Sequence, residues 1–243
     1  MNLRTVLTAR SVALDSEQSA AAFAAASLLL RYPDDSLVES LEGLTTLCHQ
    51  LPKGFRDPYV ALCEDLSAAP LLDAQARYVA TFDLQRRCCL YLSYYLNGDT
   101  RRRGTALWTF QDAYLRAGRE VLHGELPDFL PALLEFAATG GELAAVALMN
   151  EHRAGILVLL EALEELDSPY AGVVAAIDSI LPPRDDRAIT EAERLVFDGP
   201  PSELVGIDDV EAFEPYGSGS SVGCGSTQPS GPTAVPVHIS EKS

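Results

Sequence analysis

Apolar residues recur at helical spacing through most of this chain, and no stretch of useful length alternates apolar and polar residues as a strand would. Tyr59, Leu62, Cys63 and Leu66, for example, fall at i, i+3, i+4 and i+7, on one face of a helix. Neither a βαβ rhythm nor an internal repeat is present. The sequence therefore predicts an all-α protein, a compact globular helical bundle with short loops.

Local start and stop signals divide this pattern into helices. Asp15 and Gln18 have the spacing of a capping box. Asp57-Pro58 predicts a cap followed by proline at the first helical position. Asp99 is predicted to cap a helix that Gly118 ends. The spacing predicts further helical segments, namely Leu72 with Ala76 and Val79, Cys88 to Leu96, Phe129 to Ala138, Glu142 to Leu166, a helix opened by Ser168-Pro169, and Asp186 to Phe197.

The composition changes abruptly at residue 200. Gly, Pro and Ser make up 20 of the 44 residues of 200–243, and from residue 185 onward acids outnumber bases 11 to 3. Such a segment buries too little apolar surface to offset the entropy of ordering. We predict a flexible leader (1–13), one helical domain (14–199) and a disordered Gly/Pro/Ser-rich acidic tail (200–243). A solubilising extension is favoured over a specific binding role for this tail.

The charge balance narrows the classes of partner. The formal net charge is -17, so the chain repels nucleic acid and anionic membrane surfaces. The apolar run from Ala20 to Leu30 is too short to span a bilayer, and Asp15 and Glu17 precede it where a secretory signal needs positive charge. We interpret the run as a buried first helix, and with no export signal or anchor we expect a cytoplasmic protein.

The residues that usually carry chemistry are scattered. The five cysteines are odd in number and form no C-x-x-C, the four histidines have no metal-ligand spacing, and no phosphate-binding loop or nucleophile elbow is present. Cys88-Cys89 is interpreted as core packing on an apolar helix, and His152 as a solvated or hydrogen-bonded histidine. We therefore expect no catalytic residue, no metal site and no enzymatic activity.

Arginine and tyrosine gather in the middle of the chain. Eight arginines lie between residues 77 and 119, around Tyr91, Tyr94 and Tyr95. They are consistent with a solvated face whose salt bridges to nearby aspartates stabilise little. They are equally consistent with a binding surface, because arginine and tyrosine are enriched among the residues that dominate interface energies. Composition leaves both interpretations open.

The same region resembles a known family. The strings FDLQRR from Phe82, LYL and YY around Tyr91 to Tyr95, and GDTRRRG from Gly98 to Gly104 are similar to the NarJ family, which assembles the molybdenum cofactor into respiratory nitrate reductase. The string ELPDFLP from Glu125 to Pro131 resembles the acidic-proline motif of the broader TorD-type maturation chaperones, although Phe129 stands where that motif often has histidine. Together the similar segments cover most of residues 16–182.

The resemblance implies a function as well as a fold. Family members are all-helical cytoplasmic chaperones without catalytic activity. They bind the apo catalytic (alpha) subunit of nitrate reductase, partly through its N-terminal segment, and keep it open for molybdopterin guanine dinucleotide before membrane assembly. Two alternatives remain, a guanine-nucleotide-responsive maturation factor and a helical adaptor for an unrelated partner. The candidate partner-binding residues are Arg86, Arg87, Tyr91, Tyr94, Tyr95, Asp99, Arg101, Arg102, Arg103, Glu125, Pro127 and Asp128.

Overall fold

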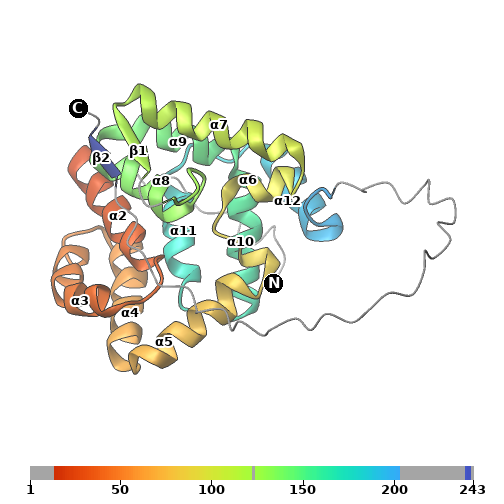
Figure 1. The fold of residues 1–243 in the computed structure, drawn as a ribbon. Coiled ribbons are helices and arrows are strands. Elements are labelled where there is room, and N and C mark those ends of the chain that lie inside the picture. The colour runs from red at the N-terminus through yellow and green to blue at the C-terminus, as the bar shows by residue number, and fades with distance from the viewer. Residues whose placement is uncertain (1–13, 122–123, 203–238, 242–243) are drawn as a thin grey trace, which may run out of the picture.

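The computed structural model describes residues 14–121, 124–202 and 239–241, and it confirms an all-α bundle (Figure 1). The first half contains α2 (Ser16–Leu29), α3 (Asp35–Cys48), α4 (Lys53–Ala68), α5 (Leu71–Tyr78), η1 (Val79–Asp83), η2 (Arg86–Cys88), α6 (Leu92–Asn97) and α7 (Arg101–Arg116). The second half contains α8 (Leu130–Phe136), η3 (Ala137–Gly141), α9 (Glu142–Glu151), α10 (Arg153–Glu165), α11 (Ala171–Ile180) and α12 (Asp186–Asp198).

Two helices organise the core. The predicted buried first helix is α2, which packs against α8, η3, α3, α4 and α11. Its Ser27 hydroxyl donates to the Pro131 carbonyl of α8 over 2.8 Å, which joins segments about a hundred residues apart in the sequence. The second organiser, α10, packs against α11, α12, α6 and η2. The segments η2 and α6, which carry two of the family-like strings, therefore pack on α10.

Several predicted helix ends are confirmed. Asp15 and Gln18 form the capping box of α2, in which Asp15 accepts from the backbone N–H of Gln18 over 2.8 Å. α6 ends at Asn97, followed by Gly98 at φ 55°, and α7 ends just before Gly118 at φ 69°. Positive φ favours glycine, so these stops follow from local conformation alone.

The prediction that Asp57-Pro58 opens a helix is wrong. α4 begins at Lys53 and contains Pro58 in its second turn. Proline has no backbone N–H, so Pro58 cannot donate to the carbonyl of Gly54. Gly54 is an exposed residue of the first turn, and only this one hydrogen bond is lost close to the helix start. The predicted inner face of this helix, from Tyr59 to Leu66, is buried.

The predicted apolar face of α5 is also wrong. Leu72 is 75% exposed and Ala76 is exposed, whereas Ala74 and Tyr78 are buried. Tyr78 packs among other aromatic rings, with centroids 4.7 Å from Phe82 and 6.1 Å from Tyr170, and its hydroxyl donates to the Leu30 carbonyl over 3.0 Å. The large tyrosine therefore decides which side of this short helix faces the core.

The stretch predicted as one helix from Glu142 to Leu166 is two helices. They break at His152, which has φ -98° and ψ 18° and is 4% exposed. Its Nδ1 lies 3.0 Å from the Leu148 carbonyl, and its ring centroid lies 4.8 Å from that of Phe110. The break turns α10 away from α9, and His152 fills the corner between them.

A buried ionic cluster fixes the C-terminal helices. Arg153 is 3% exposed; its Nε donates to Asp178 Oδ1 over 2.8 Å, and its other nitrogens contact the carbonyls of Asp178 and Pro182. Arg184 Nε donates to the second oxygen of Asp178 over 2.9 Å. Asp178 is 1% exposed, so its charge is compensated from both sides. The cluster ties α10 to α11 and to the loop before α12.

Three described residues of the tail form a strand. β2 (Ile239–Glu241) pairs antiparallel with β1 (Arg119–Val121), directly after α7. Residues 1–13, 203–238 and 242–243, for which we predicted flexibility and disorder, lie outside the described residues, whereas residues 200–202 are described. The domain boundaries stay a prediction, although the described helices begin at Ser16 and end at Asp198.

One described helical stretch, Leu130–Glu151, is long and apolar enough to cross a membrane. Half of it is buried inside the fold, and its backbone kinks at Thr139 and Gly140, where φ reaches 106°. It comprises α8, η3 and α9, and α8 packs on α2. The same length and composition are found in the core helices of soluble proteins, which is the position this stretch occupies.

Candidate functional site

The two most specific strings of the sequence lie side by side. The N–H of Leu92 donates to the Asp128 carbonyl over 3.0 Å, and the N–H of Leu130 donates to the Leu90 carbonyl over 2.8 Å. Tyr91 and Phe129 form an antiparallel bridge between these bonds. The tyrosine-rich segment and the acidic-proline loop, more than thirty residues apart, are thus one structural unit.

This pairing corrects the predicted helix from Cys88 to Leu96. Only α6, from Leu92, is α-helical; Cys88 ends η2, and Cys89 and Tyr91 have extended backbones. Tyr95 is buried, and its hydroxyl lies 2.9 Å from the Arg87 carbonyl and 2.8 Å from the Cys89 carbonyl, so it holds this turn in place. Burial raises the pKa of the Cys88 thiol to about 11, which keeps the thiol protonated and unreactive near neutral pH.

Asp128 is the internal brace of the unit. It is 0% exposed, and its Oδ2 accepts from the backbone N–H of Ser93 over 3.0 Å and from the Ser93 hydroxyl over 2.6 Å. Those bonds satisfy a donor in the first turn of α6. Phe129, at the position where the motif often has histidine, places its ring 5.2 Å from that of Tyr91. This loop therefore positions the tyrosines.

A tyrosine–arginine cluster forms the outer part of the unit. The Tyr91 hydroxyl donates to Glu125 Oε1 over 3.0 Å. The Arg103 guanidinium lies 5.9 Å from the ring centroid of Tyr91 and 5.8 Å from that of Tyr94, within cation–π range. Arg103 also pairs with Asp99 at 3.3 Å. Arg103 therefore packs onto Tyr94 of the preceding helix and onto Tyr91 just before that helix.

The prediction that Asp99 caps α7 is wrong. Thr100 occupies the cap position and makes no side-chain capping bond, while Asp99 pairs with Arg103 one turn into the helix. Arg101 and Arg102 lie in the first turn of α7, and both are exposed. An ion pair four residues apart uses the Asp99 carboxylate here in place of a cap.

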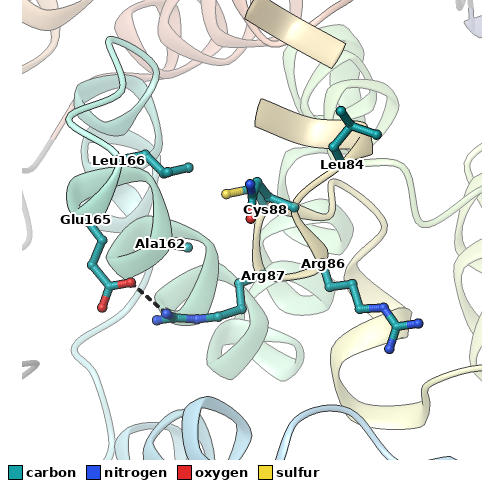
Figure 2. A pocket seen from close by; sticks show the side chains of 8 residues that line it. Leu84, Arg86, Arg87, Cys88, Ala162, Glu165 and Leu166 are labelled. Carbon is teal, nitrogen blue, oxygen red and sulfur yellow. Dashed lines mark hydrogen bonds and ion pairs between the residues drawn. The ribbon is translucent and has the colours of Figure 1, made fainter. Parts of the chain in front are cut away.

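A pocket of about 470 Å³ opens beside this unit, between η2 and α10 (Figure 2). Leu84 and Leu166 stand on opposite sides of it, 72% and 48% exposed. Arg87 reaches across to α10 and pairs with Glu161 at 3.0 Å and Glu165 at 2.6 Å.

The charged side chains at this pocket differ in burial and in their partners. Burial raises the pKa of the Glu161 carboxyl, and the Arg87 charge partly offsets this rise. Arg86 also lines the pocket, but its side chain points away from Glu165 (Figure 2). The pocket thus combines apolar edges with one compensated and one outward-facing arginine.

The predicted candidate residues divide by exposure. Arg86, Asp99, Arg101 and Arg102 are exposed; Arg87, Tyr91, Tyr94, Arg103 and Glu125 are half-buried; Tyr95, Pro127 and Asp128 are buried. Sequence reasoning did not identify Leu84, Leu166 or the exposed Trp108 as surface residues. The spacing along the helix could have identified Trp108 as a surface residue, because Trp108 does not lie on the helix face that carries the buried Phe110 and Tyr114. Within the described residues, no group of three His, Cys, Asp or Glu side chains could hold a metal ion.

These contacts define a small all-helical bundle whose two motif segments share one surface. A family model described as "Nitrate reductase delta subunit" matches residues 48–176, more than half of the chain. The chain therefore belongs to the nitrate reductase delta subunit family, and the predicted membership of the NarJ family is confirmed.

Named relatives agree with this assignment. The chain is 30% identical over 163 residues to the probable nitrate reductase molybdenum cofactor assembly chaperone NarJ of Bacillus subtilis, covering 65% of this chain and 89% of that protein. It is 35% identical over 150 residues to the chaperone of the same name, NarJ, of Escherichia coli, covering 60% and 63%. It is 41% identical over 152 residues to the nitrate reductase-like protein NarX of Mycobacterium tuberculosis, covering 63% of this chain but only 23% of that longer protein.

Proposed function

We propose that this protein is a chaperone for the catalytic subunit of respiratory nitrate reductase. It binds the apo subunit, including its N-terminal segment, in the cytoplasm and supports insertion of the molybdenum cofactor before membrane assembly. Molybdopterin guanine dinucleotide is cargo for the client, and the chaperone itself retains no cofactor and catalyses no reaction. The names of its relatives support this role.

The observation that carries the proposal is the pairing of the two motif segments. Leu90–Leu92 and Asp128–Leu130 bond to each other, and the tyrosine–arginine cluster packs on their outer side. Exposed arginines beside these segments contribute little to folding, because surface ion pairs stabilise a protein by about 0–1 kcal/mol. Arg101 and Arg102 are exposed at the start of α7, next to that cluster.

We assign the N-terminal segment of the client to the pocket between η2 and α10. Its apolar edges, Leu84 and Leu166, suit the apolar side of an amphipathic helix, a common mode of recognition by helical domains. The tyrosine–arginine cluster and the exposed arginines next to it then contact the body of the client. Buried Asp128 and Tyr95 maintain the shape of this surface without touching the client.

The chaperone acts by mass action. A protein that binds only the incomplete client raises the population of that state, and the effect grows with the ratio of free chaperone to its dissociation constant. Loading the cofactor and closing the client remove the bound surface and release the chaperone. No turnover chemistry is required of any residue.

The test compares two exposed leucines with a third. Leu84→Asp and Leu166→Asp place a charge at the pocket edge, and Leu143→Asp places one on α9, where Leu143 is 90% exposed. All three variants are expected to keep the melting temperature, because Leu84 and Leu143 are largely in solvent and Leu166, 48% exposed, lies at the end of α10. Titration of the client N-terminal peptide into each full chain gives at least about a tenfold weaker Kd for the first two, or about 1.4 kcal/mol, and an unchanged Kd for Leu143→Asp.

Two results would contradict the proposal. One is an equally weaker Kd for the client peptide in all three variants, which would contradict the assignment of the peptide to the pocket. The other is affinity purification of the wild-type chain from nitrate-respiring cells without the catalytic subunit, which would remove the client. Saturable binding of a guanine nucleotide by the purified chain would favour the nucleotide-responsive alternative.

A further inference from the structure

The outer face of α7 is unusual for a surface helix. Trp108 is 64% exposed and is the only tryptophan of the chain. Thr105 and Arg101 lie one and two turns before it on the same side of the helix, and Arg102 is exposed next to Arg101. Arginine and tryptophan dominate binding energies where they are buried by a partner. We define Arg101, Arg102, Thr105 and Trp108 as the α7 patch.

The chain itself returns to this patch. After α12 ends at Asp198, the backbone passes directly over Gly98, where a Cβ added to the glycine would lie 1.7 Å from the carbonyl oxygen of Pro201. Gly98 is three residues before Arg101. In Figure 1 the C-terminal end of α12 likewise lies beside the N-terminal end of α7. The described backbone at Pro201 therefore lies close to the N-terminal end of the α7 patch.

The sequence that follows Ser202 complements the patch. Segment 203–214 reads ELVGIDDVEAFE, with five acids, no lysine or arginine, and apolar residues between the acids. Arg101 and Trp108 are about 10 Å apart along the helix axis at 1.5 Å per residue. Twelve residues extend up to roughly 40 Å, so the segment is long enough to cover both. Because it is covalently attached, its effective concentration at the patch is on the order of millimolar.

We propose that the α7 patch is the docking site of the chain's own acidic segment 203–214. The carboxylates of the segment pair with Arg101 and Arg102, and its apolar side chains cover the Trp108 indole. The docking itself requires no client. Because Arg101 and Arg102 also border the surface assigned to the client, the segment competes with the client there, a consequence that rests on the proposed function.

The single tryptophan makes the docking directly measurable in the full chain. The test variant carries Asp208→Asn, Asp209→Asn and Glu211→Gln. The control carries Glu39→Gln, Glu42→Gln and Glu64→Gln, three exposed acids of α3 and α4 that give the same change in net charge. We expect a red shift of Trp108 emission and a loss of protection from acrylamide in the test variant alone. Salt at about 0.5 M, where the Debye length is on the order of 4 Å, produces the same change in the wild type.

Three outcomes would overturn the docking. They are identical emission and quenching in the wild type and the test variant, an equal change in the control variant, and protection that disappears on dilution, since the last would assign the segment to a second copy. Competition is measured separately with the client peptide, which binds the test variant more tightly than the wild type. A fluorescence change without a change in peptide affinity would overturn competition and leave docking in place.

Discussion

Two glycines of one motif are expected to respond to alanine in opposite directions. Gly98 has φ 55° and ψ -150°, a conformation that costs other residues about 1–3 kcal/mol. An alanine Cβ there also meets the Pro201 carbonyl oxygen at 1.7 Å and its carbon at 2.9 Å. Both atoms are backbone, so they yield only if the segment after α12 moves. We expect Gly98→Ala to lower the free energy of unfolding by about 2 kcal/mol or more.

Gly104 is the matched control. It lies inside α7, it is exposed, and an added Cβ meets no atom within 4 Å. Alanine is favoured over glycine in a helix interior by about 1 kcal/mol, so Gly104→Ala is expected to stabilise the protein. Urea unfolding of both full-chain variants measures the difference. For a domain of this size 2 kcal/mol corresponds to roughly 4–8 °C in melting temperature.

The signs of the two changes in the free energy of unfolding decide whether the reasoning holds. If Gly98→Ala is as stable as the wild type, the backbone strain and the contact with Pro201 are both refuted. If both alanines destabilise the protein equally, α7 does not hold Gly104 in an open helical position. A loss confined to Gly98→Ala, with a gain for Gly104→Ala, supports the reasoning for each glycine.

Three further predictions test the interior and the domain boundary. Burial lowers the pKa of His152, so its stabilising contribution is present above the unfolded pKa of about 6.5 and is lost as the pH falls below it. Unfolding measured at pH 7 and pH 5.5 should therefore show a smaller loss of stability in His152→Gln, whereas His49→Gln, which changes an exposed histidine, should match the wild type. Arg153→Met leaves Asp178 half-compensated in the core and should cost about 3 kcal/mol, against less than about 1 kcal/mol for Arg194→Met, whose ion pair with Glu191 is exposed; similar losses would contradict the role of the cluster. Limited proteolysis should leave a helical fragment of about residues 15–197, and early cleavage inside α10 would place the boundary elsewhere.

Much of the fold could be predicted because its signals are local. The capping box at Asp15 and the glycine stops at Gly98 and Gly118 depend on residues within one turn of each helix end. The apolar face of α11, from Tyr170 to Leu181, is long enough for its periodicity to be unambiguous, and it is buried. Such features need no knowledge of the rest of the chain.

The errors have long-range causes. Cys89 and Tyr91 read as helical, but bonding of Leu90 and Leu92 to the loop at Asp128 keeps them extended. α5 has only eight residues, so the spacing of Leu72, Ala76 and Val79 does not fix which side faces the core, and the aromatic neighbours of Tyr78 determine the orientation. No local pattern contains this information.

The candidate partner-binding site stays a prediction, and the structure shows only how its residues are arranged. The candidate residues come from two motifs, and these two motifs are in contact. The sequence could not distinguish Asp128, which is 0% exposed, from Glu125, which is half-buried and bonds to Tyr91. Both are acids of one loop, and only the packing around them separates a brace from a surface group.

The pairing of Leu90–Leu92 with Asp128–Leu130 also has a consequence for biosynthesis. The arginines and tyrosines leave the ribosome well before the loop that orders them, so a nascent chain that stops short of residue 130 lacks the hydrogen bonds that shape their surface. The ionic cluster at Arg153 and the segment over Gly98 come later still. A nascent chain thus completes this surface only after Pro201 has left the ribosome, well after its arginines and tyrosines have been made.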